Sequence, residues 1–567
     1  MAALKTRTEE TGVNSNEFSE FFIETDVLVL GAGAAGCGAA LAAVREGAKV
    51  VLLDKGKLES CGCLGGGNDH FMAVLNSEKP FDKQEDMIKF FDKPLSGFNK
   101  RMLSQWFETM QIMVEYLLSI GVEFEKDEDG SWLRTGGFGQ PGNWWINIAN
   151  GQFIKRLIAK SLRKLGVDVL DHIMITKLLV EKNQITGAIG FKVTSGDVYV
   201  FKPQTVVLAM GNSANRATTN STGNPYNTWH SPFNTGSQYA LAYDAGVKII
   251  NTDILQQAQL IPKGFGSAGM HGINCAGAHE IDAFGNRFMG KYHPMKENGP
   301  RRNQILGTYL ELVKGNGPPF HMDMRHCDPE EIKHLQNVLM PGDKATFTDY
   351  CQQKGIDFTQ KPLEVELSEL ELGGMLLTDE HFSTNIQNLF NGCVFYAFSG
   401  SMCSGYLGGL AAAKAVKKTG KSKPLNTAVV QHEKEKVYKP FTLKKGMDYI
   451  EFETAIRQVM NYYMKFIRNE QGMKIALEKL NYIETFSEDL CARNLHELMR
   501  VHEAKILIKV CKLATLASLQ RKESGRTIYN RSDYPELNPE YAKILCVSSE
   551  NGETKIEWLE NYSNTAG

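Results

Sequence analysis

The stretch Asp26-Val-Leu-Val-Leu-Gly31-Ala-Gly33-Ala-Ala-Gly36 decides how the rest of the chain is interpreted. Asp26 opens a continuous apolar run that ends at Leu30, which is typical of a strand buried on both faces of a parallel sheet. A helix of small residues is predicted over 37–46, and a second apolar strand over 49–53 leads into Asp54. Together these segments predict a βαβ unit with a glycine-rich turn after its first strand.

The glycine spacing is the one that a dinucleotide requires. Gly31 permits the tight turn, Gly33 lets the backbone approach a pyrophosphate, and Gly36 lets the helix pack closely on the strand. The amino terminus of the helix offers free N–H groups and a partial positive charge to the phosphates. Asp54 stands where an acid accepts the ribose hydroxyls of the adenosine half. We therefore predict a dinucleotide site.

Later segments favour FAD over NAD. Residues 61–68, Cys-Gly-Cys-Leu-Gly-Gly-Gly-Asn, follow the acid-bearing strand and would let backbone pass against an isoalloxazine ring. A buried strand is predicted to end at Gly211, and residues 399–415 read as a loop that enters a small-residue helix aimed at the flavin. No second nucleotide fingerprint is visible, so electrons are expected to come from a protein partner. A site built from both ends of the chain suits a ligand as long as FAD.

The residues predicted to contact FAD come from these segments. They are Gly31, Gly33, Ala34, Ala35, Gly36, Asp54, Lys55, Gly62, Cys63, Gly65, Gly66, Gly67, Asn68, Ala209, Gly211, Asn234, Ser404, Gly405, Tyr406 and Leu407.

Length and composition narrow the class of protein. The chain has 567 residues and a formal net charge of −2, which argues against a basic nucleic-acid footprint and a polybasic membrane anchor. The first 22 residues lack the apolar core of a signal peptide, and no apolar run is long enough to span a membrane. Its 11 cysteines form no Cys-x-x-Cys pair, so we expect reduced thiols, a cytoplasmic location, no iron–sulfur cluster of its own and no metal site.

Several longer motifs carry a family resemblance. They are residues 142–155 (GNWWINIANGQFIK), 234–246 (NTGSQYALAYDAG), 302–304 with 315–318, the serine-rich segment 399–415, and 521–526 (RKESGR) with 531–535 (RSDYP). The chain resembles the flavoprotein subunits of the succinate dehydrogenase/fumarate reductase superfamily, and within it the alpha subunits of adenylylsulfate (APS) reductases. The resemblance implies an α/β fold in which a Rossmann-like FAD-binding domain (22–255 and 373–432) is interrupted by an α+β capping domain (256–372). A C-terminal helical domain (433–567) is expected to follow.

The chain also departs from these patterns. Two histidines that hold a dicarboxylate in the superfamily fall on Ala258 and Glu369, which disfavours simple fumarate reduction. Cys61 stands in place of the flavin-linking histidine, so we expect FAD to be bound non-covalently. Lys263 follows Ile-Pro where the APS reductases place an arginine, and Gln152 replaces their glutamate. These departures leave open a different specificity or a lost activity.

Four residues are the candidates for catalysis. Arg302 follows a Gly-Pro turn and is a candidate anion clamp, against the alternative that Arg301 and Arg302 are a solvated charge pair. Lys263 is the other cation that could replace the missing arginine. His271 lies in a glycine-rich part of the capping domain and is either a substrate donor or an ordinary loop histidine. Trp145, beside Trp144, is either a wall of the flavin site or a core aromatic residue.

The resemblance implies the FAD-carrying subunit of a hetero-oligomeric oxidoreductase. A ferredoxin-like iron–sulfur subunit would supply electrons, and flavin N5 would act on a small anionic substrate under the capping domain; no nucleic-acid partner is expected. One alternative is a fumarate-reductase-like enzyme that reduces an activated C=C bond in another acid. A second alternative is an electron-transfer subunit without a substrate of its own.

Overall fold

The computed structural model describes residues 18–560 except for 78, 94, 138, 219–223, 227, 229, 255, 258–259, 266–272, 275, 344, 368–370 and 420–423. Three residues singled out above, Ala258, His271 and Glu369, therefore lie outside the described residues.

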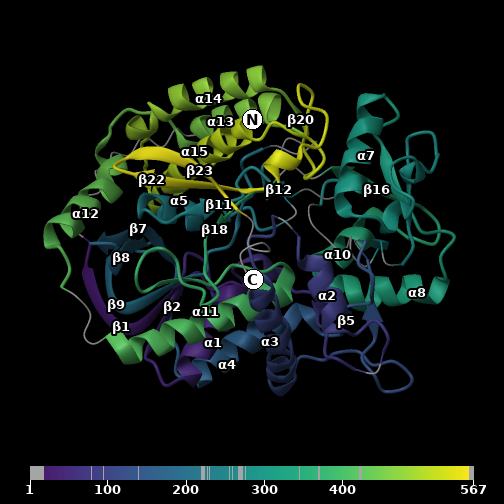
Figure 1. The fold of residues 1–567 in the computed structure, drawn as a ribbon, viewed down its shortest axis with the longest axis horizontal. Coiled ribbons are helices and arrows are strands. Elements are labelled where there is room, and N and C mark those ends of the chain that lie inside the picture. The colour runs from purple at the N-terminus through teal and green to yellow at the C-terminus, as the bar shows by residue number, and fades with distance from the viewer. Residues whose placement is uncertain are drawn as a thin grey trace, which may run out of the picture.

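A central sheet organises the first half of the chain (Figure 1). Five of its strands run parallel in the order β6-β2-β1-β9-β19. Two antiparallel strands, β8 and then β7, extend it from the first half of β9, while β19 pairs with the second half. The strands are β1 (Glu20–Leu30), β2 (Val50–Asp54), β6 (Asp168–Asp171), β7 (Ile173–Glu181), β8 (Gln184–Lys192), β9 (Val198–Leu208) and β19 (Leu389–Asn391).

The alternation of side chains along β1 explains why this strand is apolar throughout. Val27 and Val29 point to one face of the sheet and join one hydrophobic cluster. Leu28 and Leu30 point to the opposite face and join another. Both faces are covered, as the continuous apolar run predicted.

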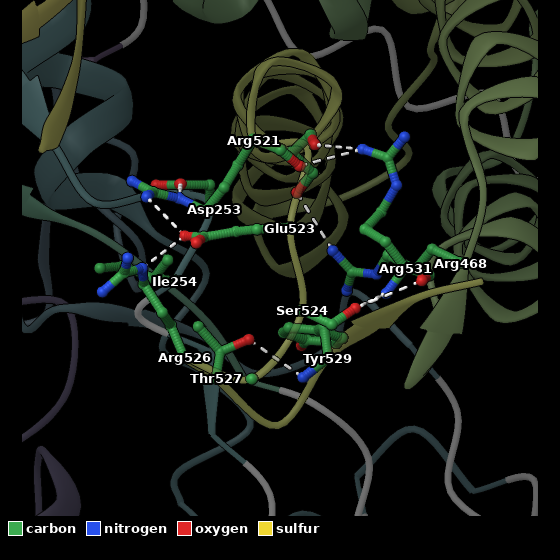
Figure 2. A pocket seen from close by; sticks show the side chains of 12 residues that line it. Asp253, Ile254, Arg468, Arg521, Glu523, Ser524, Arg526, Thr527, Tyr529 and Arg531 are labelled. Atoms are coloured by element: carbon green, nitrogen blue, oxygen red, sulfur yellow. Dashed lines mark hydrogen bonds and ion pairs between the residues drawn. The ribbon is translucent and has the colours of Figure 1, made fainter. Parts of the chain in front are cut away.

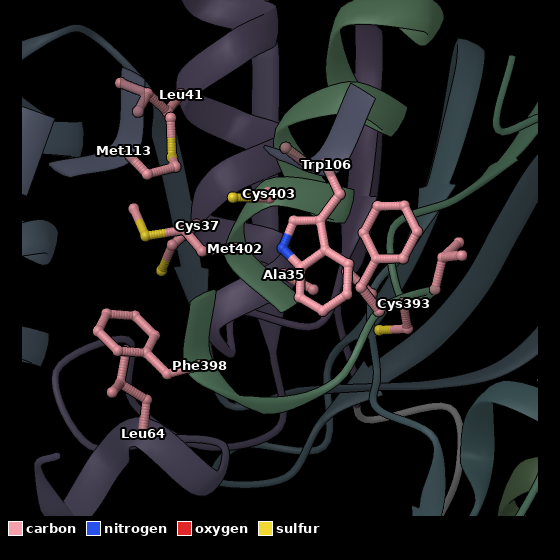
Figure 3. Close-up of a cluster of buried hydrophobic side chains, with 14 of the residues drawn as sticks. Ala35, Cys37, Leu41, Leu64, Trp106, Met113, Cys393, Phe398, Met402 and Cys403 are labelled. Atoms are coloured by element: carbon pink, nitrogen blue, oxygen red, sulfur yellow. The ribbon is translucent and has the colours of Figure 1, made fainter. Parts of the chain in front are cut away.

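Helices cover the two faces. The first face carries α1 (Ala34–Arg45), α11 (Ala397–Thr419), α3 (Lys100–Ser119) and α4 (Ile154–Lys164). The second carries α5 (Ser237–Asp244) and the C-terminal helices α12 (Thr427–Thr442), α13 (Tyr449–Tyr463), α14 (Glu470–Glu484) and α15 (Leu495–Gln520). Figure 3 shows part of the first core, to which α1 contributes Cys37 and Leu41, α3 contributes Trp106 and Met113, and α11 contributes Met402 and Cys403.

Helices α1 and α11 cross with their backbones in contact. A Cβ atom added to Gly405 would lie 1.9 Å from the carbonyl oxygen of Ala35, and one added to Gly38 would lie 2.2 Å from that of Met402. Since real Cβ atoms do not approach so closely, the small residues of both helices are required by their packing. This crossing places the amino-terminal halves of the two helices side by side.

A third hydrophobic cluster is separate from the two that cover the sheet, and the elements that form most of it, among them β16, α7 and α8, lie on the right of Figure 1. Most of its residues come from 260–367, joined by Phe466, Ile528 and Tyr529. Its sheet has the order β13-β16-β15-β14, and the domain limits predicted at 256 and 372 stay predictions. The elements are β13 (Leu260–Pro262), β14 (His279–Ile281), β15 (Phe320–Asp323), β16 (Leu363–Leu367), α7 (Arg301–Val313), α8 (Pro329–His334), α9 (Met340–Asp343) and α10 (Ala345–Lys354).

The C-terminal region is mainly helical, as predicted, but it ends in a hairpin that the sequence did not suggest. Strands β22 and β23 pair with each other, and β22 also pairs with β11. The remaining elements are short: α2 (Gln84–Phe91), β3 (His70–Met72), β4 (Arg134–Thr135), β5 (Trp145–Asn147), β10 (Ser213–Ala214), β11 (Ile249–Ile250), β12 (Gln256–Gln257), β17 (Glu371–Gly373), β18 (Met375–Leu376), β20 (Ile467–Arg468), β21 (Asn530–Arg531), β22 (Ile544–Glu550) and β23 (Glu553–Leu559).

Candidate functional site

A cavity of about 1040 Å³ opens at the carboxyl end of β1, where the glycine turn leads into α1. This is the edge at which parallel α/β sheets bind ligands. Its walls come from both halves of the chain. Of the residues predicted to contact FAD, those that line it are Gly31, Gly33, Ala34, Ala35, Asp54, Lys55, Gly62, Cys63, Gly67, Asn68, Ala209, Gly211 and Asn234.

The glycine turn has the geometry that its sequence requires. Gly31 has φ +97°, and a Cβ atom there would lie 2.4 Å from the carbonyl oxygen of Ala209. Asp54 ties the turn to the end of β2: its Oδ2 accepts a hydrogen bond from the Ala32 N–H at 2.8 Å, and its Oδ1 accepts one from the Gly56 N–H at 2.8 Å. The N-terminus of α1 thus faces the cavity with its unpaired N–H groups.

The remaining predicted contacts do not line the cavity. They are Gly36, Gly65, Gly66, Ser404, Gly405, Tyr406 and Leu407. Helix α11 begins at Ala397, so the segment read as a loop is helix, and residues 404–407 lie in its second and third turns. The Ser404 hydroxyl donates to the Gly392 carbonyl at 2.7 Å, and Gly405 touches α1. The first turn of α11 lines the cavity instead, through Ala397, Phe398 and Ser401.

One part of the cavity wall comes from the C-terminal helix α15. Its Glu503 is fully buried, pairs with Lys55 at 2.5 Å and accepts a hydrogen bond from Arg216 at 2.9 Å. Burial alone would raise the pKa of this carboxyl group, but the attraction of Lys55, Arg216 and Arg500 outweighs it and lowers the pKa to about 2. Sequence reasoning missed Glu503, because nothing local relates it to a lysine 448 residues away.

Aromatic and apolar side chains gather in another part of the cavity wall. Trp145 lines it and donates its indole N–H to Gln140 Oε1 at 2.7 Å. Gln140 lines it as well, and the neighbouring Gly139 donates its N–H to the Asn298 carbonyl at 3.0 Å, shortly before α7 begins. Met72, the cross-strand partner of Trp145, and Phe91 and Tyr396 complete this wall. Trp144 is fully buried in the core and does not reach the cavity.

Arg302, in the first turn of α7, brings a cation to the same cavity. Its side chain is partly buried, and its Nε donates to the Thr527 carbonyl at 2.5 Å. It forms no ion pair with any acid in the part of the chain that the structure describes. Burial lowers the pKa of the guanidinium, which nevertheless stays charged at neutral pH. A partly buried cation without an acid attracts an anion.

The two remaining catalytic candidates are Lys263 and His271. Lys263 lies on the surface beside β13, where it pairs with Glu364 at 2.5 Å, and it does not line the cavity. His271 falls outside the described residues. Of the four candidates, the structure therefore brings Arg302 and Trp145 together in one cavity and leaves Lys263 apart.

The loop that holds Arg302 is itself anchored by an arginine cluster (Figure 2). Arg521 pairs with buried Asp253, and Arg526 pairs with Glu523 at 2.5 Å. Arg531 pairs with Asp533 at 2.7 Å. The hollow among these side chains measures only about 30 Å³, the size of a single water molecule. We interpret the cluster as support for the loop that presents the Thr527 carbonyl to Arg302 and Ile528 to the cavity.

The cavity fits FAD by the chemistry of its walls. Glycine backbone and a helix amino terminus suit a diphosphate, and an acid stands at the end of β2. Beyond β2, Gly62 and Gly67 line the cavity with backbone, and a Cβ atom at Gly67 would lie 2.3 Å from the Gly342 carbonyl oxygen. Among the described residues, no cluster of three or more histidine, cysteine or acidic residues could hold a metal. Fold and site together define a flavin-dependent oxidoreductase of the dinucleotide-binding class.

Comparison with known proteins agrees with this class. The family described as "FAD binding domain" matches residues 26–389, and the one described as "Fumarate reductase flavoprotein C-term" matches residues 453–565. The first match covers more than half of the chain, so the chain belongs to the FAD-binding flavoproteins of the succinate dehydrogenase/fumarate reductase superfamily. FAD as cofactor is thereby confirmed.

Individual relatives are distant but cover nearly the whole chain. An uncharacterized FAD-dependent oxidoreductase of Methanocaldococcus jannaschii is 25% identical over 95% of this chain and 98% of its own. One of the subunits of the fumarate reductase (CoM/CoB) of Methanothermobacter marburgensis is 23% identical over 93% and 97%. The structure of the adenylylsulfate reductase of Archaeoglobus fulgidus superposes with a TM-score of 0.87 at 22% identity, covering 98% and 99%. Among the described residues, no helix combines the length and apolar character needed to cross a membrane.

Proposed function

We propose that this chain is the FAD-carrying subunit of a hetero-oligomeric oxidoreductase that exchanges electrons between a small anionic substrate and a ferredoxin-like iron–sulfur subunit. When bound, FAD supplies a carrier that accepts electrons singly and passes them on in pairs. The M. marburgensis relative is named as a subunit, which supports a partner chain here. We further propose that FAD is held without a covalent bond, by the cavity residues given above.

The observation that carries the proposal is the partly buried Arg302, which faces the flavin cavity without an acid partner in the described chain. Its guanidinium would bind the anionic group of the substrate and oppose the negative charge that develops during transfer. Trp145, Phe91 and Ile528 would exclude water from the bound substrate. Lys263 has no part in this arrangement, because its ammonium already pairs with Glu364 on the surface.

Adenylylsulfate is the substrate to test first, because the motifs of the chain resemble those of the APS reductases and the fold superposes on one. A second candidate is the reduction of an activated C=C bond in an apolar acid. The side chains of Met72, Phe91 and Ile528 favour it, because they give this part of the cavity an apolar wall. Both candidates need an anion held by Arg302.

Anaerobic titration of the purified holoprotein tests these candidates. Bleaching of the oxidised flavin band by sulfite, deepened by AMP, supports adenylylsulfate chemistry. Reoxidation of the dithionite-reduced protein by an α,β-unsaturated acid supports the second candidate. A flavin that a ferredoxin reduces but that responds to neither group of compounds would contradict both and favour an electron-transfer role without a substrate.

Substitution of Arg302 tests whether this residue binds the anionic group of the substrate. Arg302→Leu is expected to lower kcat/KM for the responding substrate by about 10- to 100-fold, the usual effect of losing a charged hydrogen bond. Arg302→Lys should recover part of the loss, because lysine restores the positive charge but not the paired N–H donors of the guanidinium. Arg325→Leu, which removes an exposed arginine paired with Asp323, is the control. Unchanged kinetics in Arg302→Leu would refute the role.

A further inference from the structure

Lys155 is a buried lysine that none of the functions above uses. It is the second residue of α4, its side chain is 1% exposed, and its Nζ donates to the carbonyl oxygen of Ala32 in the glycine turn. Within the described residues it forms no ion pair with a carboxylate. Burial alone would lower the pKa of the ammonium, but nearby Asp54 and the hydrogen bond to the Cys37 sulfur act against burial and raise it, so the group is charged at neutral pH.

Several groups converge on the same peptide. The Ala32 N–H donates to Asp54 Oδ2 at 2.8 Å, and the Ala32 carbonyl oxygen accepts from Lys155. The Sγ atoms of Cys61 and Cys37 lie 3.2 Å and 3.5 Å from that oxygen. Cys37 Sγ also lies 3.4 Å from Lys155 Nζ. A buried cation is thus directed at one carbonyl group in the middle of the Gly31–Gly33 turn, at a desolvation cost that the fold retains.

Because the peptide bond is planar, the contact between Lys155 and the Ala32 carbonyl also sets the direction of the next N–H group. In a trans peptide the carbonyl of one residue and the N–H of the next point in opposite directions. Since the Ala32 carbonyl is drawn inward to Lys155, the N–H of Gly33 is turned outward, toward the cavity that Gly33 lines. Gly33 is also the residue that caps the amino terminus of α1, where a diphosphate is expected.

We propose that Lys155 is a positioning residue of the cofactor site, which aims the Gly33 N–H at the FAD diphosphate and places a buried positive charge behind the glycine turn. The inference concerns FAD binding only. It holds whichever substrate or partner the protein uses, and turnover plays no part in its test.

The test compares FAD binding by apoproteins of wild type, Lys155→Met and Lys160→Met. Methionine keeps most of the length of the lysine but removes the charge and the donor. Lys160 lies on the same helix and is exposed, so its variant controls for changes in α4. From the effect of losing a hydrogen bond to a charged group, Lys155→Met is expected to bind FAD about 10- to 100-fold more weakly in a fluorescence titration. Lys160→Met should bind as wild type does.

Phosphorus NMR of FAD bound at saturation separates positioning from a merely structural role. The diphosphate resonances are expected to move in Lys155→Met and to stay in place in Lys160→Met. Wild-type affinity in folded Lys155→Met overturns the proposal, and so does weakened binding with unmoved resonances. If Lys155→Met does not fold, Lys155→Leu, which also removes both the donor and the charge, takes its place. Wild-type affinity or unmoved resonances in that variant overturn the proposal equally.

Discussion

Glu503 offers the most demanding test of the energetics of this fold. Replacing it by glutamine would leave the partly exposed Lys55 without its carboxylate, and the buried Arg216 and Arg500 with Glu453 alone. Removing one partner of a buried ion pair costs about 3–5 kcal/mol. An independent estimate comes from the pKa of Glu503, whose drop from 4.5 to about 2 corresponds to about 3 kcal/mol of stability at neutral pH. The two estimates agree.

The pH dependence follows from the direction of this shift. Because the pKa is lower in the folded protein, the contribution of Glu503 is complete above pH 4.5 and disappears as the pH falls toward about 2. We expect urea unfolding of Glu503→Gln, followed by tryptophan fluorescence, to give a free energy of unfolding about 3 kcal/mol below that of wild type at pH 7. The difference should shrink to about half at pH 3.

The control is Glu478→Gln, which removes an exposed acid of α14 and should leave the unfolding curve unchanged. The reasoning is refuted if Glu503→Gln unfolds at the same urea concentration and with the same slope as wild type at pH 7. It is equally refuted if the difference between the two proteins does not depend on pH.

Two further predictions concern helix packing and the ion pair between His334 of α8 and Glu125. Gly405→Val should prevent folding or cost more than about 3 kcal/mol in a urea titration, because its Cβ would meet the backbone of α1 at 1.9 Å. Lys414→Val, exposed on the same helix, should be tolerated, and equal stability of the two variants would contradict the packing argument. His334 of α8 lies 3.2 Å from Glu125, which raises the pKa of the imidazole. Its stabilising effect is therefore complete below pH 6.5 and is lost as the pH rises through the raised pKa. In thermal melts at pH 6 and pH 8.5, the melting temperature of wild type should fall more than that of His334→Gln when the pH is raised. Equal falls in the two proteins would contradict the ion pair.

The βαβ unit could be predicted from the sequence because its signals are local. The apolar run, the glycine turn and the acid lie within thirty residues, and each is explained by a single steric or electrostatic requirement of the βαβ unit. The start of α11 could not be predicted in the same way. Glycine and serine are poor helix formers, so residues 399–404 resemble a loop. Helix α11 forms there because only small residues let its backbone touch α1, a contact that is 370 residues apart in the chain.

The residues of the candidate site also fall into those that a local motif predicts and those that only the folded chain identifies. Asp54 and Gly33 line the cavity and follow from the motif alone. Arg302 and Lys263 look equally suitable in the sequence, and only the folded chain shows one at the cavity and the other in a surface ion pair. Lys155 stands within a motif that carried the family resemblance, but its role depends on which carbonyl it meets after α4 has packed beneath the turn.

The part of the cavity wall formed by α15 has a consequence for assembly of the protein. His496, Met499 and Glu503 belong to the last helix, yet they line the same cavity as the first glycine turn. A ligand that contacts both ends of a chain stabilises their association, because the free energy of its binding is lost when either end detaches. Cofactor binding and docking of α15 are therefore thermodynamically coupled, so FAD adds to the stability that the packing of the C-terminal helices already provides.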